Sequence, residues 1–165
     1  MPLVLFACVH NAGRSQMAAA WFNRLADPAK ARAISAGTRP ADRVHPEVVD
    51  SMREVGMDLE HAVPGLLTGE LAGSATLLVT MGCGEECPYV PPGLERLDWP
   101  VADPKGASPE RVTAIRDEIR RMVAALVATR GWEAHDASRS RGERPCGSGE
   151  DKPESLDRRR SRPER

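Results

Sequence analysis

The sequence is poor in aromatic residues and in net charge, and it has no long apolar run. Its 165 residues include 3 tryptophans, 2 phenylalanines and 1 tyrosine, and the formal net charge is −1. A chain near neutrality offers no overall basic field to nucleic acid. The longest apolar run near the N-terminus, Leu3–Val9, is far too short to span a bilayer, and no basic segment precedes it. We therefore expect a cytoplasmic protein without nucleic-acid or membrane partners.

Cysteine is also scarce, and its 4 copies are Cys8, Cys83, Cys87 and Cys146. In the cytosol thiols stay reduced, so these residues are expected to be reactive rather than structural cross-links. The C-x3-C pair could bind zinc, but no second pair of ligands accompanies it, so no metal site is predicted. An alternative is that Cys83 and Cys87 are buried loop residues without a redox function. Cys146 is interpreted as an incidental exposed thiol.

The two ends of the chain differ in composition. Residues 1–132 carry the apolar periodicity and are predicted to form one domain. Residues 133–165 contain 9 basic and 8 acidic residues and only four apolar ones. Such a segment cannot bury enough apolar surface to offset its ordering entropy, so a disordered polar tail is expected. The arginine cluster at 158–160 is interpreted as a solvated part of this tail.

Within the first 132 residues, short apolar runs alternate with helical stripes. Strands are expected at 3–7, 31–36, 76–80 and 94–99, and helices at 15–25, 46–55, 68–72 and 108–130. Ser108 followed by Pro109 is a typical helix start. This alternation predicts an α/β sandwich with a parallel sheet. Ligands bind such folds at the carboxyl ends of the strands, where Cys8 and Cys83 are expected.

The segment from Cys8 to Arg14 has the spacing C-x5-R and lies between a predicted strand and a predicted helix. Loop N–H groups and the helix N-terminus would together favour an anion there. The guanidinium of Arg14 can clamp a tetrahedral oxyanion through two parallel hydrogen bonds. The same positive field favours the thiolate form of Cys8. The pattern therefore predicts a nucleophilic cysteine in an oxyanion-binding loop.

Neighbouring residues support this interpretation. Ser15 can donate a hydrogen bond to the thiolate, Asn11 can hold the loop through bonds to the backbone, and Gly13 permits an unusual backbone geometry. No catalytic role is assigned to His10. The alternative is a buried cysteine beside a surface arginine, since C-x5-R alone is a weak signal. The predicted substrate-binding residues are Val9, His10, Asn11, Ala12, Gly13, Arg14 and Ser15.

The loop resembles that of low-molecular-weight tyrosine phosphatases, and the larger match is to the arsenate reductases that share their fold. The matching segments are Cys8–Met17, Ser35–Thr38 with His45–Pro46, Glu54–Asp58, Val79–Pro88 and Trp99–Gly106. The resemblance implies a three-layer α/β sandwich with a four-stranded parallel sheet. It also implies reduction of arsenate to arsenite, with Cys8 as nucleophile, Arg14 as oxyanion clamp and Asp103 as general acid. Asp-Pro is also a common turn opener, which is the alternative for Asp103.

The resemblance further implies a second thiol that resolves the adduct on Cys8. Cys83 and Cys87 are the candidates in a thioredoxin-coupled relay, although their C-x3-C spacing is closer than in the thioredoxin-linked branch. In an actinobacterial branch, mycothiol attacks at Cys8 and a glutaredoxin-like protein completes the cycle. No bound cofactor is expected beyond such an external thiol reductant. Ala19 stands where some members carry a potassium-binding glutamate, so no potassium site is predicted, and a monomer is expected.

Two rival functions remain open at this point. A phosphatase acting on phosphoesters would share Cys8, Arg14 and Asp103, but phosphatases of this fold carry tyrosines after the Asp-Pro pair, and here Lys105 and Gly106 follow. A non-enzymatic oxyanion-binding module would use Cys8 only as a redox sensor.

Overall fold

The computed structural model describes residues 1–82 and 90–135. The predictions made for Cys83 and Cys87, and for the tail from 136 onward with Cys146, therefore lie outside the described residues. Trp132 packs edge-on against Phe22 at a ring-centroid distance of 5.8 Å. The N–H of Ala134 donates to the carbonyl of Leu25 over 3.3 Å. The folded domain thus continues at least to Ala134.

The centre of the domain is a four-stranded parallel sheet in the order β2-β1-β3-β4. Its strands are β1 (Leu3–Cys8), β2 (Arg32–Gly37), β3 (Leu77–Thr80) and β4 (Glu95–Asp98). The apolar run of β1 lies between two neighbours, with Leu5 opposite Ile34 on one side and Leu78 on the other. Continuous burial is what a central parallel strand requires. The predicted parallel sheet is confirmed.

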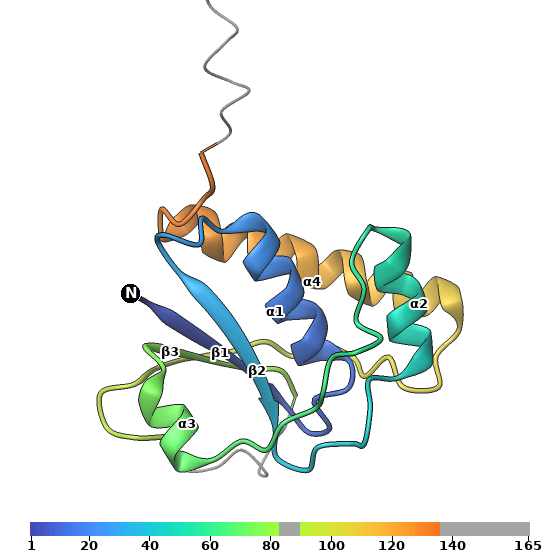
Figure 1. Ribbon diagram of the computed structural model, residues 1–165, viewed down its shortest axis with the longest axis horizontal. Coiled ribbons are helices and arrows are strands. Elements are labelled where there is room, and N and C mark those ends of the chain that lie inside the picture. The colour runs from blue at the N-terminus through green and yellow to red at the C-terminus, as the bar shows by residue number, and fades with distance from the viewer. Residues whose placement is uncertain (83–89, 136–165) are drawn as a thin grey trace, which may run out of the picture. The chain divides into compact units, whose positions relative to one another are not determined.

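The described part of the chain has four helices: one between the first two strands, two between the second and third, and one after the last strand (Figure 1). They are α1 (Arg14–Leu25), α2 (Pro46–Glu54), α3 (Gly69–Ser74) and α4 (Pro109–Thr129). The cap of α4 is the predicted one, since the Ser108 hydroxyl accepts a hydrogen bond from the Arg111 N–H over 3.2 Å. Gly56 takes the left-handed conformation, with φ of 81°, just past the end of α2. Each element lies within one or two residues of its predicted range.

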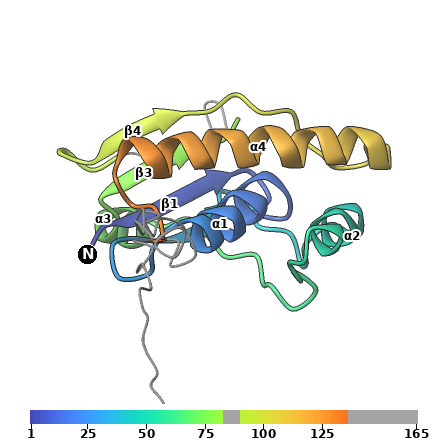
Figure 2. The same ribbon diagram turned by 90° about the horizontal axis from the view of Figure 1, so that it is seen from above.

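The sheet divides the apolar side chains between its two faces. Val4 and Phe6 of β1 face the larger core together with residues of α1 and α4, whereas Leu5 and Ala7 face a smaller core that includes Ala72 of α3. This is the period-2 alternation of a strand that is covered on both faces. Figures 1 and 2 show α1, α2 and α4 grouped on one face of the sheet and α3 on the other. The three-layer sandwich is confirmed.

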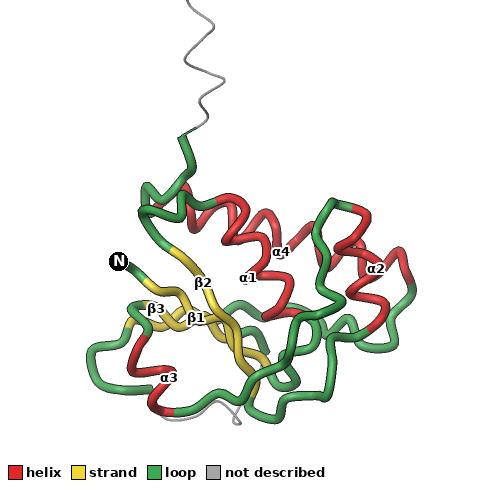
Figure 3. The backbone as a smooth tube through the Cα atoms, in the orientation of Figure 1, coloured by secondary structure: helices red, strands yellow, loops and turns green. Residues whose placement is uncertain are grey.

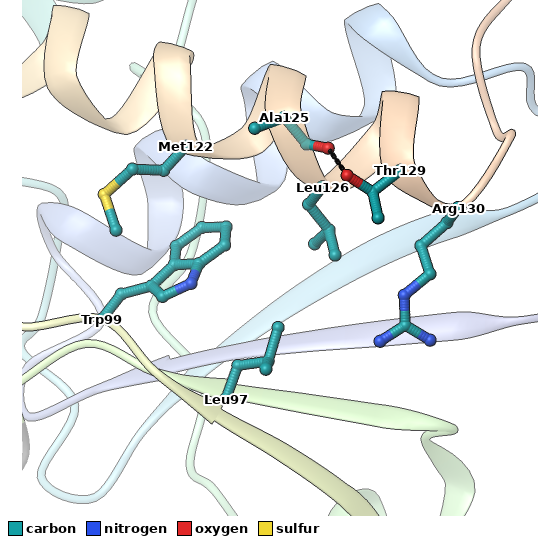
Figure 4. A pocket seen from close by; sticks show the side chains of 7 residues that line it. All are labelled: Leu97, Trp99, Met122, Ala125, Leu126, Thr129 and Arg130. Atoms are coloured by element: carbon teal, nitrogen blue, oxygen red, sulfur yellow. Dashed lines mark hydrogen bonds between the residues drawn. The ribbon is translucent and has the colours of Figure 1, made fainter.

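A groove of about 420 Å³ lies between β4 and the C-terminal half of α4 (Figure 4). Its residues are Leu97, Trp99, Met122, Ala125, Leu126, Thr129 and Arg130. Trp99 packs against Phe6 with ring centroids 5.7 Å apart, so the groove rests on the larger core. Arg130 forms an ion pair with Glu95 of β4. None of these residues belongs to the loop after β1. Across the described part of the chain, no helix has the length and apolarity to cross a bilayer.

The segments that leave the carboxyl ends of β1 and β2 lie together at one edge of the sheet (Figure 3). The N–H of Thr38, after β2, donates to the carbonyl of Cys8 over 3.2 Å, and the N–H of Arg39 donates to Val9 over 2.8 Å. A parallel sheet places its ligand site at this edge. The candidate site is therefore built where β1 ends.

Candidate active site

The loop from Val9 to Gly13 joins the end of β1 to the start of α1, and three of its carbonyl groups point away from it toward the segment between β2 and α2. The carbonyls of Val9, His10 and Ala12 accept hydrogen bonds from the N–H groups of Arg39, Ala41 and His45 over 2.8–2.9 Å. In a planar trans peptide the C=O and the following N–H point in opposite directions. The N–H groups of His10, Asn11 and Gly13 are therefore turned toward the inside of the loop. Together with the N-terminus of α1, this arrangement suits an anion.

Cys8 lies at the base of this loop with its side chain buried, at 2% exposure. Its sulfur is 2.9 Å from the hydroxyl oxygen of Ser15, in the first turn of α1. Asn11 Nδ2 donates to the same hydroxyl oxygen over 2.7 Å. Because Asn11 supplies a donor to Ser15, the Ser15 proton is free to point at the sulfur. The expected pairing of Ser15 with Cys8 is thus present in the geometry.

Asn11 is the residue that shapes the loop. It is fully buried and has a positive φ of 48°, a conformation that asparagine tolerates better than most residues. Its Oδ1 accepts hydrogen bonds from the N–H of Gly65 over 2.9 Å and from Nε2 of Gln16 over 3.2 Å. Gln16 and Gly65 were not predicted as part of the site, because neither has a recognisable motif. The expectation that Asn11 binds the backbone agrees with the Gly65 contact.

The two glycines at this edge have a steric role. A Cβ on Gly13 would lie 2.8 Å from Cγ of Pro104, and a Cβ on Gly37 would lie 2.6 Å from the carbonyl oxygen of Val9. Gly13 was expected to serve an unusual backbone geometry, and its φ of −147° with ψ of −92° lies outside both the α and the β region. Pro104 also packs directly on Gly13, which leaves no room for a side chain. This close approach brings the segment after β4 against the loop.

Arg14 and Asp103 are brought together by that packing. One guanidinium nitrogen of Arg14, Nη1, donates to the carbonyl of Val101 over 3.1 Å, and Nη2 lies 3.8 Å from Oδ2 of Asp103. The Arg14 side chain is 9% exposed, whereas that of Asp103 is 42% exposed. A buried arginine fork beside a partly solvated carboxylate can bind an oxyanion and deliver a proton to it. Gly82, directly before the segment that contains Cys83, lies against the same guanidinium.

Two histidines lie close to the loop. The rings of His10 and His45 lie edge-on, 6.5 Å apart. Burial lowers the pKa of His45, and the positive charges of Lys105 and His10 add to this, whereas the carboxylates of Glu47 and Asp103 raise it; the net shift of the pKa is downward. Within the described residues, no group of three His, Cys, Asp or Glu side chains is placed to hold a metal ion. Ala19 is buried in the larger core.

The comparisons with known proteins agree with this geometry. The family described as low molecular weight phosphotyrosine protein phosphatase matches residues 3–135. The chain belongs to this phosphatase family. Its relatives within the family include a Bacillus cereus protein named arsenate reductase 1, which is 35% identical over 76% of this chain and 94% of the relative.

Two similar solved structures are also arsenate reductases by name. The thioredoxin-dependent arsenate reductase of Corynebacterium glutamicum is 36% identical, with a TM-score of 0.66 over 78% of this chain, and the match spans 61% of that longer chain. An arsenate reductase from Archaeoglobus fulgidus is 30% identical, with a TM-score of 0.65 over 76% of this chain and 98% of its own. The family resemblance inferred from the loop is confirmed, and so is the fold.

Proposed function

We propose that this protein reduces arsenate to arsenite, with Cys8 as the nucleophile. The observation that carries the proposal is the convergence of three groups on one loop: the Cys8 sulfur beside Ser15, the buried Arg14 fork, and Asp103 next to that fork. This set suits a tetrahedral oxyanion and the departure of one of its oxygens. The arsenate reductases among its relatives support arsenate over a phosphoester as the substrate.

The first chemical step displaces oxygen from arsenic. The Cys8 thiolate attacks As(V) while Arg14 and the loop N–H groups hold the remaining oxygens. A sulfur–arsenic bond forms, and one arsenic–oxygen bond breaks. Asp103 gives its proton to the departing oxygen, which leaves as water. Ser15 stabilises the thiolate before the attack.

The second step transfers two electrons to arsenic. Another thiol attacks the Cys8 sulfur, a disulfide forms, and the electron pair of the sulfur–arsenic bond stays on arsenic, which leaves as arsenite. We propose Cys83 or Cys87 as this thiol, with thioredoxin as the final reductant. The Corynebacterium glutamicum relative, which is thioredoxin-dependent, supports this choice. Mycothiol attack at Cys8, followed by a glutaredoxin-like protein, is the alternative.

The experiment that tests the proposal follows NADPH consumption with arsenate as substrate. Reduced protein is supplied with a thioredoxin system, or with mycothiol and a glutaredoxin-like protein, and Cys8→Ser, Cys83→Ser and Cys87→Ser variants are assayed in parallel. Turnover with thioredoxin that is lost in all three variants supports the relay. Turnover only with mycothiol, lost in Cys8→Ser alone, supports the alternative coupling. No arsenate turnover with either system, together with hydrolysis of a phosphoester, would overturn the reductase proposal.

A further inference from the structure

The segment that carries Asp103 is a largely exposed turn between β4 and α4. Asp103, Lys105 and Gly106 are exposed, and only Pro104 among residues 102–106 is buried. The N–H of Lys105 donates to Asp103 Oδ1 over 3.0 Å, and Gly106 has a positive φ of 69°. These local features give the turn its shape. They do not by themselves hold the turn against the loop that contains Cys8.

A polar link to the rest of the site comes from Glu47 on α2. Its Oε1 accepts a hydrogen bond from the N–H of Gly106 over 2.9 Å, although the two residues are far apart in the chain. The N-terminal end of α2 is itself bound to the loop after β1, since the N–H of His45 donates to the carbonyl of Ala12 over 2.9 Å. A continuous path of contacts therefore runs from the loop through α2 to the Asp103 turn.

Glu47 is charged when it makes this contact. Burial raises the pKa of Glu47, but the hydrogen bond from Gly106, a bond from its own N–H and the nearby His45 together lower it below the ordinary value. Its place in the first turn of α2 also suits a negative charge. The hydrogen bond to Gly106 is therefore charge-assisted and stronger than one between neutral groups.

We propose that Glu47 is a positioning residue for general-acid catalysis: it holds the turn at Gly106 so that Asp103 faces the oxyanion held by Arg14. The proposal rests on the proposed function, because it assigns Asp103 the protonation of the leaving oxygen. The effect of Glu47 on the site is therefore indirect and passes through the turn. Small displacements of a catalytic group can cost large factors in rate, so the loss of this link is expected to lower kcat rather than substrate affinity.

A double-mutant cycle tests this role. Glu47→Ala is expected to lower kcat for arsenate about 10-fold and to leave KM within about twofold, as expected when only transition-state positioning is lost. Glu47→Gln keeps an acceptor oxygen for Gly106 and should retain most of the rate. In an Asp103→Asn background, Glu47→Ala should cause no further loss of kcat. Asp50→Ala, an exposed carboxylate of the same helix that pairs with Arg53 across 3.9 Å, is the matched control and should not change kcat.

Two outcomes would overturn the proposal. These are an unchanged kcat in Glu47→Ala, or the same fold-loss with and without the Asp103 carboxylate, which would mean that Glu47 acts on the fold or on the loop after β1. If Glu47→Ala does not fold, Glu47→Asp, which keeps the charge but shortens the reach, replaces it in the cycle. If the wild-type protein does not turn over arsenate but hydrolyses a phosphoester, the proposed function fails. The same cycle is then run with that phosphoester, whose leaving oxygen also requires a proton.

Discussion

Gly37 should be one of the least replaceable residues of the domain, although it is not part of the loop that carries Cys8. A Cβ at this position would lie 2.6 Å from the carbonyl oxygen of Val9, 2.8 Å from the backbone nitrogen of Asn11 and 2.9 Å from the Asn11 Cβ. Two of these three atoms are backbone, and Asn11 is fully buried. No side chain can rotate away, so Gly37→Ala must displace the loop itself.

The cost follows from overpacking a dense interior. Forcing one methyl group into such a site costs about 1–3 kcal/mol. For a domain of this size that free energy corresponds to a fall in Tm of roughly 3–10 °C. Turnover should fall further than stability, since a displacement of the loop near 1 Å can cost roughly 100-fold in rate. Thermal unfolding and arsenate kcat/KM, measured on the same preparation, check both expectations.

The matched control is Gly73→Ala in α3, where a Cβ would meet nothing within 4 Å. This change should leave turnover unaltered and leave Tm unchanged or slightly raised, because alanine favours a helix over glycine. A Gly37→Ala protein with wild-type Tm and wild-type kcat/KM would refute the idea that the end of β2 fixes the loop.

Three further changes probe the same edge. Ser15→Ala removes the hydroxyl that lies 2.9 Å from the Cys8 sulfur. It should lower arsenate kcat/KM roughly 10- to 100-fold, because hydrogen bonds to charged groups contribute about 1.5–3 kcal/mol. A loss of less than twofold would contradict this role. Gly82→Ala introduces a Cβ 2.5 Å from Nη1 of Arg14, at a backbone φ of 81° that favours glycine. The change should weaken the binding of inorganic phosphate, measured by calorimetry. An unchanged Kd would argue against the contact between residue 82 and the arginine clamp. Finally, the pKa of Glu47 is lowered in the folded state, so its contribution to stability is present above its ordinary pKa of 4.5 and lost as pH falls through the folded value. Glu47→Gln should therefore flatten the acid side of the stability curve in urea unfolding between about pH 5 and pH 3, and an identical curve would rule the linkage out.

The sequence was sufficient for the architecture because its signals are local. The run Leu3–Cys8 is apolar at nearly every position, which only a strand covered on both faces requires. The start of α4 is marked by Ser108 and Pro109, and the cap hydrogen bond is present in the structure. Cys8, Ser15 and Arg14 could be predicted as a group because a strand, a loop and a helix hold them within one short segment. Their mutual geometry depends on few other parts of the chain.

The contacts that complete the site could not be predicted, because they join distant segments. Gly13 meets Pro104, and Glu47 receives the Gly106 N–H, and no local pattern records either pair. Gly13 has the unusual backbone conformation that was expected of it, but its close neighbour Pro104 could not be foreseen. In the sequence, Glu47 is indistinguishable from an ordinary acidic residue in a first helical turn. Only the topology, which brings α2 beside the turn after β4, gives it a partner.

The turn that carries Asp103 is held by an inner contact at Val101 and by outer contacts at Pro104 and Gly106, and this separates the two tasks of the site. Val101 is buried in the larger core, and its carbonyl fixes Nη1 of Arg14. That contact occupies one of the five N–H donors of the guanidinium, and Nη2 also faces Asp103, so an oxyanion can still bind to the remaining donors. Beyond Val101, the turn is held through Pro104 and the Glu47 link to Gly106. Loosening the outer contacts should therefore impair protonation while the arginine clamp stays in place, and disturbing Val101 should impair both.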